Sequence, residues 1–149
     1  MSFDPSIIGH EFDRSAYTTV TDEEIRAYAA ATGEPLAPSP DGALVAPATF
    51  VLRMQGRRYL PAAMLASLGS AGLDAGKEIE FGVPIRSGDT LTSSSRVHDV
   101  YEKTGRSGAM RFVVLRTLIT NQNGQQVAAI DQRMMFKCVG MAGKSMSAT

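Results

Sequence analysis

Glu34 is the residue of this sequence best placed for acid–base chemistry. It directly follows Gly33, where a predicted helix ends and a proline-rich stretch begins. A carboxylate works as a general base near neutral pH when its surroundings raise its pKa, and burial is the usual cause. The alternative is a solvated loop carboxylate in front of Pro35. The sequence leaves both interpretations open, and Glu34 is the catalytic candidate.

Histidine, the side chain that ordinarily titrates near neutral pH, occurs only twice, as His10 and His98. His10 lies in the N-terminal lead-in, and His98 lies within a predicted strand. Neither has a spacing typical of metal ligands, so we predict no metal site. Cys138 is the single cysteine, which excludes an internal disulfide and a multi-cysteine metal site. We expect it to be a small core residue near a strand end.

Four residues of one apolar segment are candidates for substrate binding. Phe50 and Met54 are expected in the core or in the wall of a binding tunnel. Arg57 and Arg58 follow them and are candidates for phosphate contacts, because a guanidinium binds phosphate oxygens with a fork of N–H groups. Solvated charges at a helix end are the alternative.

Asp89 is expected to be mainly a turn residue.

The length of 149 residues predicts one domain, at 1–139, followed by a flexible tail at 140–149. Fifteen basic and fifteen acidic residues balance, which argues against nucleic acid or an anionic membrane as a partner. No segment approaches the about 18 apolar residues of a membrane span, and no signal peptide is visible at the N-terminus. We therefore expect a cytoplasmic protein.

Local signals predict helices in the first half of the chain. A capping box between Thr21 and Glu24 starts a helix at 22–32, and Gly33 ends it. An apolar helix is expected from about Pro47, with a second helical piece at 62–68 and a loop at 70–76. A short strand is also expected at 17–20.

The second half of the chain predicts antiparallel strands. Apolar and polar residues alternate at 79–85, where Pro84 indicates an edge strand or a bulge. Further strands are expected at 90–103, at 109–120 in the centre of the sheet, and over a last stretch that includes 128–138, with a hairpin turn at 121–124. The predicted class is α+β, a curved antiparallel sheet wrapped around one buried apolar helix.

Five segments together carry a family resemblance that covers roughly Ile8 to Lys137. They are Ile8–Phe12, Val20–Gly33, Ala46–Phe50, Val83–Leu91 and Val100–Gly108. With these segments the sequence resembles the N-terminal-type hot-dog domain of MaoC-like dehydratases, relatives of the (R)-specific enoyl-thioester hydratases. The resemblance implies a hot-dog fold that pairs side by side with a second hot dog into a continuous sheet. It also implies an acyl thioester of CoA or of a carrier protein as substrate, with no other cofactor.

The sequence departs from this family where the acid–base residues are expected. Active members carry Asp-x-Asn-Pro-x-His just after the glycine, whereas this chain reads Glu34-Pro-Leu-Ala-Pro-Ser39. Glu34 could stand in the aspartate's place, but no histidine follows before His98. The resemblance therefore favours the non-catalytic half of a heteromeric enoyl-CoA hydratase, a hydro-lyase, that lines the acyl tunnel for bulky or long-chain substrates. The alternatives are a self-sufficient homodimeric hydratase that uses Glu34, and an acyl-CoA-binding hot-dog protein without catalysis.

Overall fold

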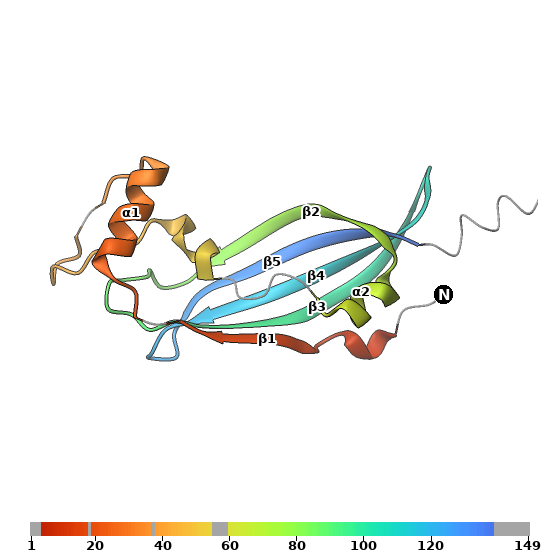
Figure 1. Cartoon of the computed structure of the whole chain (residues 1–149), viewed down its shortest axis with the longest axis horizontal. Coiled ribbons are helices and arrows are strands. Elements are labelled where there is room, and N and C mark those ends of the chain that lie inside the picture. Colours follow the sequence, from red (N-terminus) through yellow and green to blue (C-terminus); the bar gives the residue numbers. More distant parts are fainter. Residues whose placement is uncertain (1–3, 18, 37, 55–59, 139–149) are drawn as a thin grey trace, which may run out of the picture.

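The computed structural model of the chain describes residues 4–17, 19–36, 38–54 and 60–138. Five strands form a single antiparallel sheet in the order β1-β3-β4-β5-β2 (Figure 1). The candidates Arg57 and Arg58 and the predicted tail at 140–149 lie outside the described residues. The elements are η1 (Pro5–Ile7), β1 (Glu11–Ala16), α1 (Asp22–Thr32), η2 (Ala48–Met54), α2 (Ala62–Leu68), β2 (Ser70–Phe81), β3 (Thr92–Gly105), β4 (Gly108–Thr120) and β5 (Gln126–Lys137).

Helix α1 has the bounds that its capping signals predict. The Glu24 N–H donates to Thr21 Oγ1 at 3.2 Å, and the Thr21 N–H donates to Glu24 Oε2 at 3.3 Å. Gly33 ends the helix with a φ of 70°, a left-handed conformation that costs glycine little. This reciprocal cap fixes where the chain leaves the helix toward the proline-rich loop.

Strand β2 corrects the loop predicted at 70–76. The strand begins at Ser70 and pairs with β5 along its length, with register shifts that absorb Gly72 and Gly76. Gly72 is needed for this pairing, because a Cβ there would lie 2.8 Å from the Phe136 ring. The strand ends at Phe81, so Val83 and Ile85 of the predicted alternation follow it. Its position at the edge of the sheet is as predicted.

The other strands lie close to their predicted positions, except for the first strand of the chain. The strand predicted at 17–20 is absent from the described residues there, and β1 lies earlier, at Glu11–Ala16. An exposed edge strand needs little apolar alternation, which is why its sequence gives a weak signal. β4 is the central strand, as predicted, and the consecutive residues Val113, Val114 and Leu115 are all buried.

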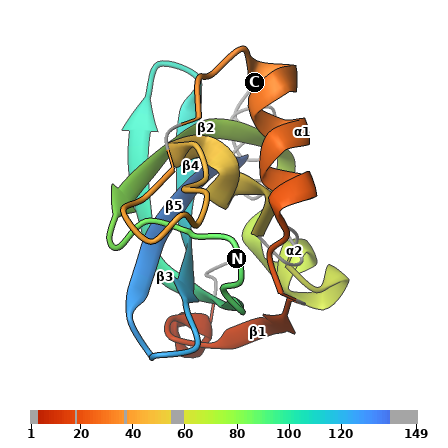
Figure 2. The same cartoon turned by 90° about the vertical axis from the view of Figure 1, so that its left-hand side faces the viewer.

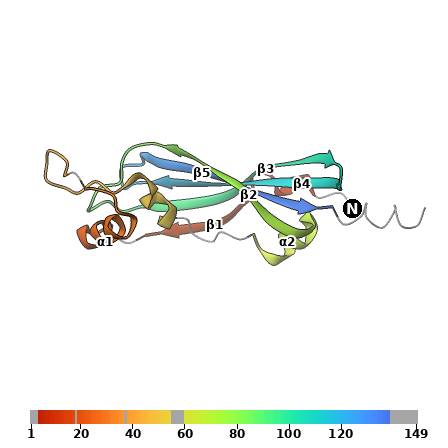
Figure 3. The same ribbon diagram turned by 90° about the horizontal axis from the view of Figure 1, so that it is seen from above.

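The helical segments cover one face of the sheet, which we call the inner face. Figure 2 shows α1 and α2 on the same side of the sheet, and Figures 1 and 3 place them at its opposite ends. The predicted apolar helix is a 3-10 helix, η2, whose Phe50 and Val51 pack against Ile119 and Ile130. A second cluster lies by α2, where Leu68 joins buried residues of β3, β4 and β5. No helix in the described part of the chain is long and apolar enough to span a membrane.

Candidate functional site

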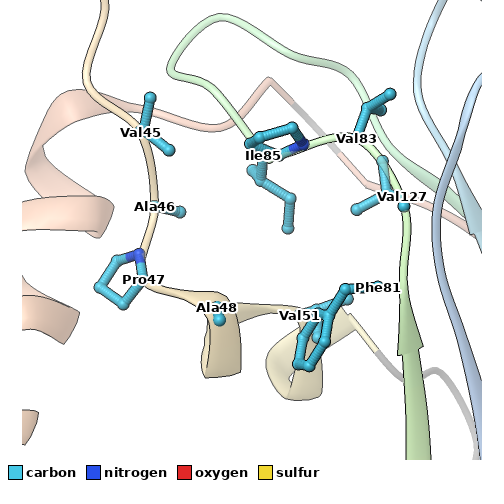
Figure 4. A pocket seen from close by; sticks show the side chains of 11 residues that line it. Val45, Ala46, Pro47, Ala48, Val51, Phe81, Val83, Ile85 and Val127 are labelled. Carbon is cyan, nitrogen blue, oxygen red and sulfur yellow. The ribbon is translucent and has the colours of Figure 1, made fainter. Parts of the chain in front are cut away.

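An apolar pocket of about 270 Å³ opens beside η2, at the end of the sheet where β2 stops. Figure 4 shows the segment 45–48 on one side and Phe81, Val83, Ile85 and Val127 on the other. Phe81 is 54% exposed, an unusual value for an aromatic side chain next to a cavity. The pocket is lined by Val45, Ala46, Pro47, Ala48, Val51, Phe81, Gly82, Val83, Pro84, Ile85 and Val127.

Backbone hydrogen bonds hold the two sides of the pocket together. The Ala46 N–H donates to the Ile85 carbonyl at 2.8 Å, and the Ser87 N–H donates to the Leu44 carbonyl at 2.9 Å. Val45 and Arg86 form an isolated β-bridge between these segments. The short ladder lets a loop with several prolines act as a rigid wall.

Gly82 permits the close approach of β2 to β5 at the pocket. A Cβ at this position would lie 2.0 Å from the Gln126 carbonyl oxygen, well inside van der Waals contact. The Gly82 N–H donates to the Val127 carbonyl at 2.8 Å. The absence of a side chain at residue 82 therefore sets the position of Val127 in the pocket wall.

A polar network ties the proline-rich loop to the same turn. The Arg86 guanidinium donates to Ser39 Oγ at 3.0 Å and to the Asp41 carboxylate. Hydrogen bonds from the Ser39 hydroxyl and then the Ala43 N–H lower the pKa of the Asp41 carboxyl to about 2. The hydrogen bond from the Arg86 guanidinium is the third contribution to this lowering of the pKa. The loop is thus held by an ionised carboxylate on the outside of the apolar pocket.

Asp89 is a buried turn residue, as expected. Its Oδ2 accepts a hydrogen bond from the Arg86 N–H at 2.9 Å, and its Oδ1 accepts one from Gln122 Nε2 at 3.0 Å. With both oxygens engaged, Asp89 fixes the turn at 86–89 against the β4–β5 turn.

Phe50 and Met54 lie in the core next to the pocket. Phe50 is fully buried and packs edge-on against Tyr28, with ring centroids 5.4 Å apart, while the Arg53 guanidinium lies 5.1 Å from its ring. Neither Phe50 nor Met54 is among the described residues that line the pocket. They support it through Val51, which belongs to the same 3-10 helix. A role in the tunnel wall stays a prediction.

The acid–base candidates lie on different elements: Glu34 follows α1, His10 precedes β1 and His98 lies in β3. Glu34 is exposed on the loop after α1, and its N–H donates to the Ala29 carbonyl at 3.0 Å. His10 precedes β1, and its carbonyl accepts from the Val97 N–H at 3.0 Å, which places the exposed His98 in the neighbouring part of β3.

The lining residues could not be identified from side-chain chemistry, because none of them has a titratable or polar side chain. The signal that could have found them lies in two segments of the family resemblance, Ala46–Phe50 and Val83–Leu91. The hydrogen bond from Ala46 to Ile85 joins these segments across about 40 residues of sequence, and only the fold shows that they form one site.

Comparison with known proteins agrees with this geometry. Residues 6–130 match the family described as FAS1-like, dehydratase domain region. No curated protein sequence matches the chain. The structure is similar to the ChsH1–ChsH2 complex of Mycobacterium tuberculosis, with a TM-score of 0.64 and 18% identity over 87% of this chain and 86% of that one.

Two further solved structures have the same fold. The MaoC-like dehydratase from Rhodospirillum rubrum has a TM-score of 0.60 and 22% identity, over 91% of this chain and 97% of that one. A chain of the HadBC complex of Mycobacterium tuberculosis, a 3R-hydroxyacyl-ACP dehydratase, has a TM-score of 0.57 and 24% identity, over 85% and 98%. These likenesses confirm the predicted hot-dog fold. The chain therefore belongs to the family described as FAS1-like, dehydratase domain region, and has the hot-dog fold.

Proposed function

We propose that this chain is a hot-dog subunit of a heteromeric enoyl-thioester hydratase in the cytoplasm, where it supplies an apolar wall for the acyl chain. The observation that carries the proposal is the lining of the pocket. All eleven described lining residues are apolar or glycine, so this site offers burial of hydrocarbon and no group that transfers a proton. The acid–base pair then belongs to the partner subunit.

The edge of the sheet supports a second subunit at this place. β2 is an edge strand, and an edge presents unpaired N–H and C=O groups that another strand can pair with. The strand ends at the exposed Phe81, on the rim of the pocket. A second hot dog paired along β2 would cover this aromatic side chain and extend the pocket into a tunnel. The HadBC and ChsH1–ChsH2 neighbours are both complexes of two kinds of chain.

Reconstitution with a candidate partner tests the proposal. The purified chain is assayed for hydration of crotonyl-CoA and of a long-chain enoyl-CoA. The assay is repeated after co-expression with a short hot-dog protein that carries Asp-x-Asn-Pro-x-His. We expect turnover only with the partner, unchanged by Glu34→Ala in this chain. Robust turnover by this chain alone, lost in Glu34→Ala, would instead show a self-sufficient hydratase.

A further inference from the structure

Four apolar side chains form one row across the face of the sheet that is turned away from the helices, which we call the outer face. Leu73 of β2 is paired with Met135 of β5, Met135 with Phe112 of β4, and Phe112 with Tyr101 of β3. Side chains of directly paired residues project from the same face of a sheet. The row lies on the outer face, because the next residue after Phe112, Val113, is buried in the α2 cluster.

The row is accessible to solvent, most of all at Leu73. Leu73 is 54% exposed, and the other three side chains are partly buried. The rings of Tyr101 and Phe112 stack at 5.1 Å between centroids with an interplanar angle of 10°. Met110, which is partly buried, extends the apolar surface on one side of Phe112 along β4, since residues two apart in a strand share a face, whereas Val114 on the other side is buried. A preformed apolar surface of this kind marks an interaction site more often than an isolated exposed residue does.

Basic residues surround this row. Lys103 and Lys137 are both paired with Met110, and Arg133 is paired with Val114, so all three project from the outer face. Arg106 is exposed at the tip of the β3–β4 turn. None of these four cations forms a salt bridge with another residue in the described part of the chain.

Three acidic residues project from the same face as these cations. Asp99 is paired with Val114, and Glu78 and Asp131 line a hollow together with Arg133. The Asp131 carboxylate is already bonded by Arg116, at 2.7 Å. The carboxylate of the nearby Glu102 is bonded on the inner face by Arg111, at 2.8 Å. The protein as a whole has balanced charge, with fifteen basic and fifteen acidic residues, so the excess at this end of the sheet is local.

We infer that this outer patch, the apolar row with its basic rim, binds an acidic protein segment that carries apolar side chains. The apolar row supplies the buried centre of an interface and the four cations supply a complementary rim. A second copy of the same patch is disfavoured, because the basic rims would repel. The row spans four strands, about 15 Å, which fits a small and transient contact rather than an obligate one.

Two other partners fit the patch less well. Bases of single-stranded nucleic acid need open ring faces. Here the two aromatic rings stack on each other, and Lys103 Nζ lies 5.7 Å from both centroids. A lipid surface favours side chains that protrude, whereas three of the four row residues are partly buried in the pleat of the sheet. The patch is also independent of the apolar pocket, which lies at the α1 end of the sheet, while the β3–β4 turn lies at the α2 end (Figure 1).

The test uses the full-length protein and a fluorescein-labelled amphipathic peptide with glutamate and leucine faces. Parallel probes are the same peptide with lysine for glutamate, phosphatidylserine vesicles and oligothymidine. We expect the acidic peptide to bind best, to weaken as salt is raised, and to shift amide resonances of β3, β4 and β5 around the row. Leu73→Ser and the double variant Lys103→Glu, Arg133→Glu should each weaken binding by about tenfold. Arg26→Glu, an equivalent charge reversal on the exposed face of α1, should leave it unchanged.

Three results would overturn the inference. The first is that the acidic and the basic peptide bind equally well, or that neither binds. The second is acidic-peptide binding that Leu73→Ser leaves intact. The third is tighter binding of the vesicles or of oligothymidine than of the acidic peptide. Leu73 is exposed on an edge strand, so Leu73→Ser should fold even if the double variant does not, and its melting curve serves as the control.

Discussion

The Arg86 guanidinium donates a hydrogen bond to the Asp41 carboxylate, and this contact ties the proline-rich loop to the turn that follows β2. The two residues are 45 positions apart in the sequence, yet both line a polar hollow next to the apolar pocket. Their side chains are 41% and 60% exposed, so the contact orients the loop more than it stabilises the whole fold.

The Asp41 network should make a small part of the protein's stability depend on pH. The pKa of this carboxyl is lowered from 3.8 to about 2, so the folded state favours its charged form. Its contribution is complete above about pH 4 and is lost as the pH falls toward about 2. The unfolding temperatures of the wild type and Asp41→Asn should therefore converge over this range. Arg86→Gln should show the same convergence, and a difference that stays constant down to pH 2 would exclude this role for Asp41.

A pair of buried serines on β3 gives a matched test of hydrogen bonding. Ser93 Oγ is buried without a hydrogen-bond partner among the described residues, whereas Ser95 and Thr117 bond to each other at 2.8 Å. Ser93→Ala should be neutral or stabilising, by up to about 1 kcal/mol, because it removes an unsatisfied group. Ser95→Ala should cost about 1–3 kcal/mol, because it leaves the Thr117 hydroxyl unpaired. Urea unfolding measures both, and equal losses in the two variants would contradict the assignment.

Gly82 gives a second matched pair, with Gly105 as control. A Cβ at Gly82 would meet backbone atoms of Gln126, whereas one at Gly105 would meet only the flexible end of Met110, at 3.1 Å. Gly82→Ala should destabilise the protein by about 1–3 kcal/mol and displace the pocket wall, while Gly105→Ala should have little effect. Chemical denaturation compares the two. A loss in Gly105→Ala as large as that in Gly82→Ala would show that the close approach is not the cause.

Elements with local signals could be predicted from the sequence, and elements defined by pairing could not. Helix α1 is set by the contacts of Thr21 and Glu24 within one turn, and the β4–β5 turn by Asn121 and Gly124, so both appeared where expected. The start of β2 was missed because Gly72 and Gly76 suggest a loop. The strand exists there because β5 lies alongside and Phe136 fills the space above Gly72.

The candidate site also has one part that the sequence reveals and one part that only the fold reveals. Glu34 was found by residue type, and the structure places it on an exposed loop after α1. The pocket depends on Val45–Ala48 meeting Phe81–Ile85, which no local pattern encodes. Residue types therefore indicated that the segment after Gly33 has no histidine for acid–base chemistry. Only the fold showed that an apolar pocket lies nearby.

Titration of acyl-CoA into the purified chain tests most directly whether this pocket holds an acyl group. The account predicts that affinity rises by about fourfold for each added methylene until the pocket is full, since each buried methylene contributes about 0.8 kcal/mol. Ala48→Trp, which fills the pocket from its exposed side, should reduce the affinity for decanoyl-CoA to that for CoA. Ala30→Trp, on the exposed face of α1, should not. Equal affinity of the wild type for decanoyl-CoA and CoA, or a chain-length dependence that survives Ala48→Trp, would contradict the account.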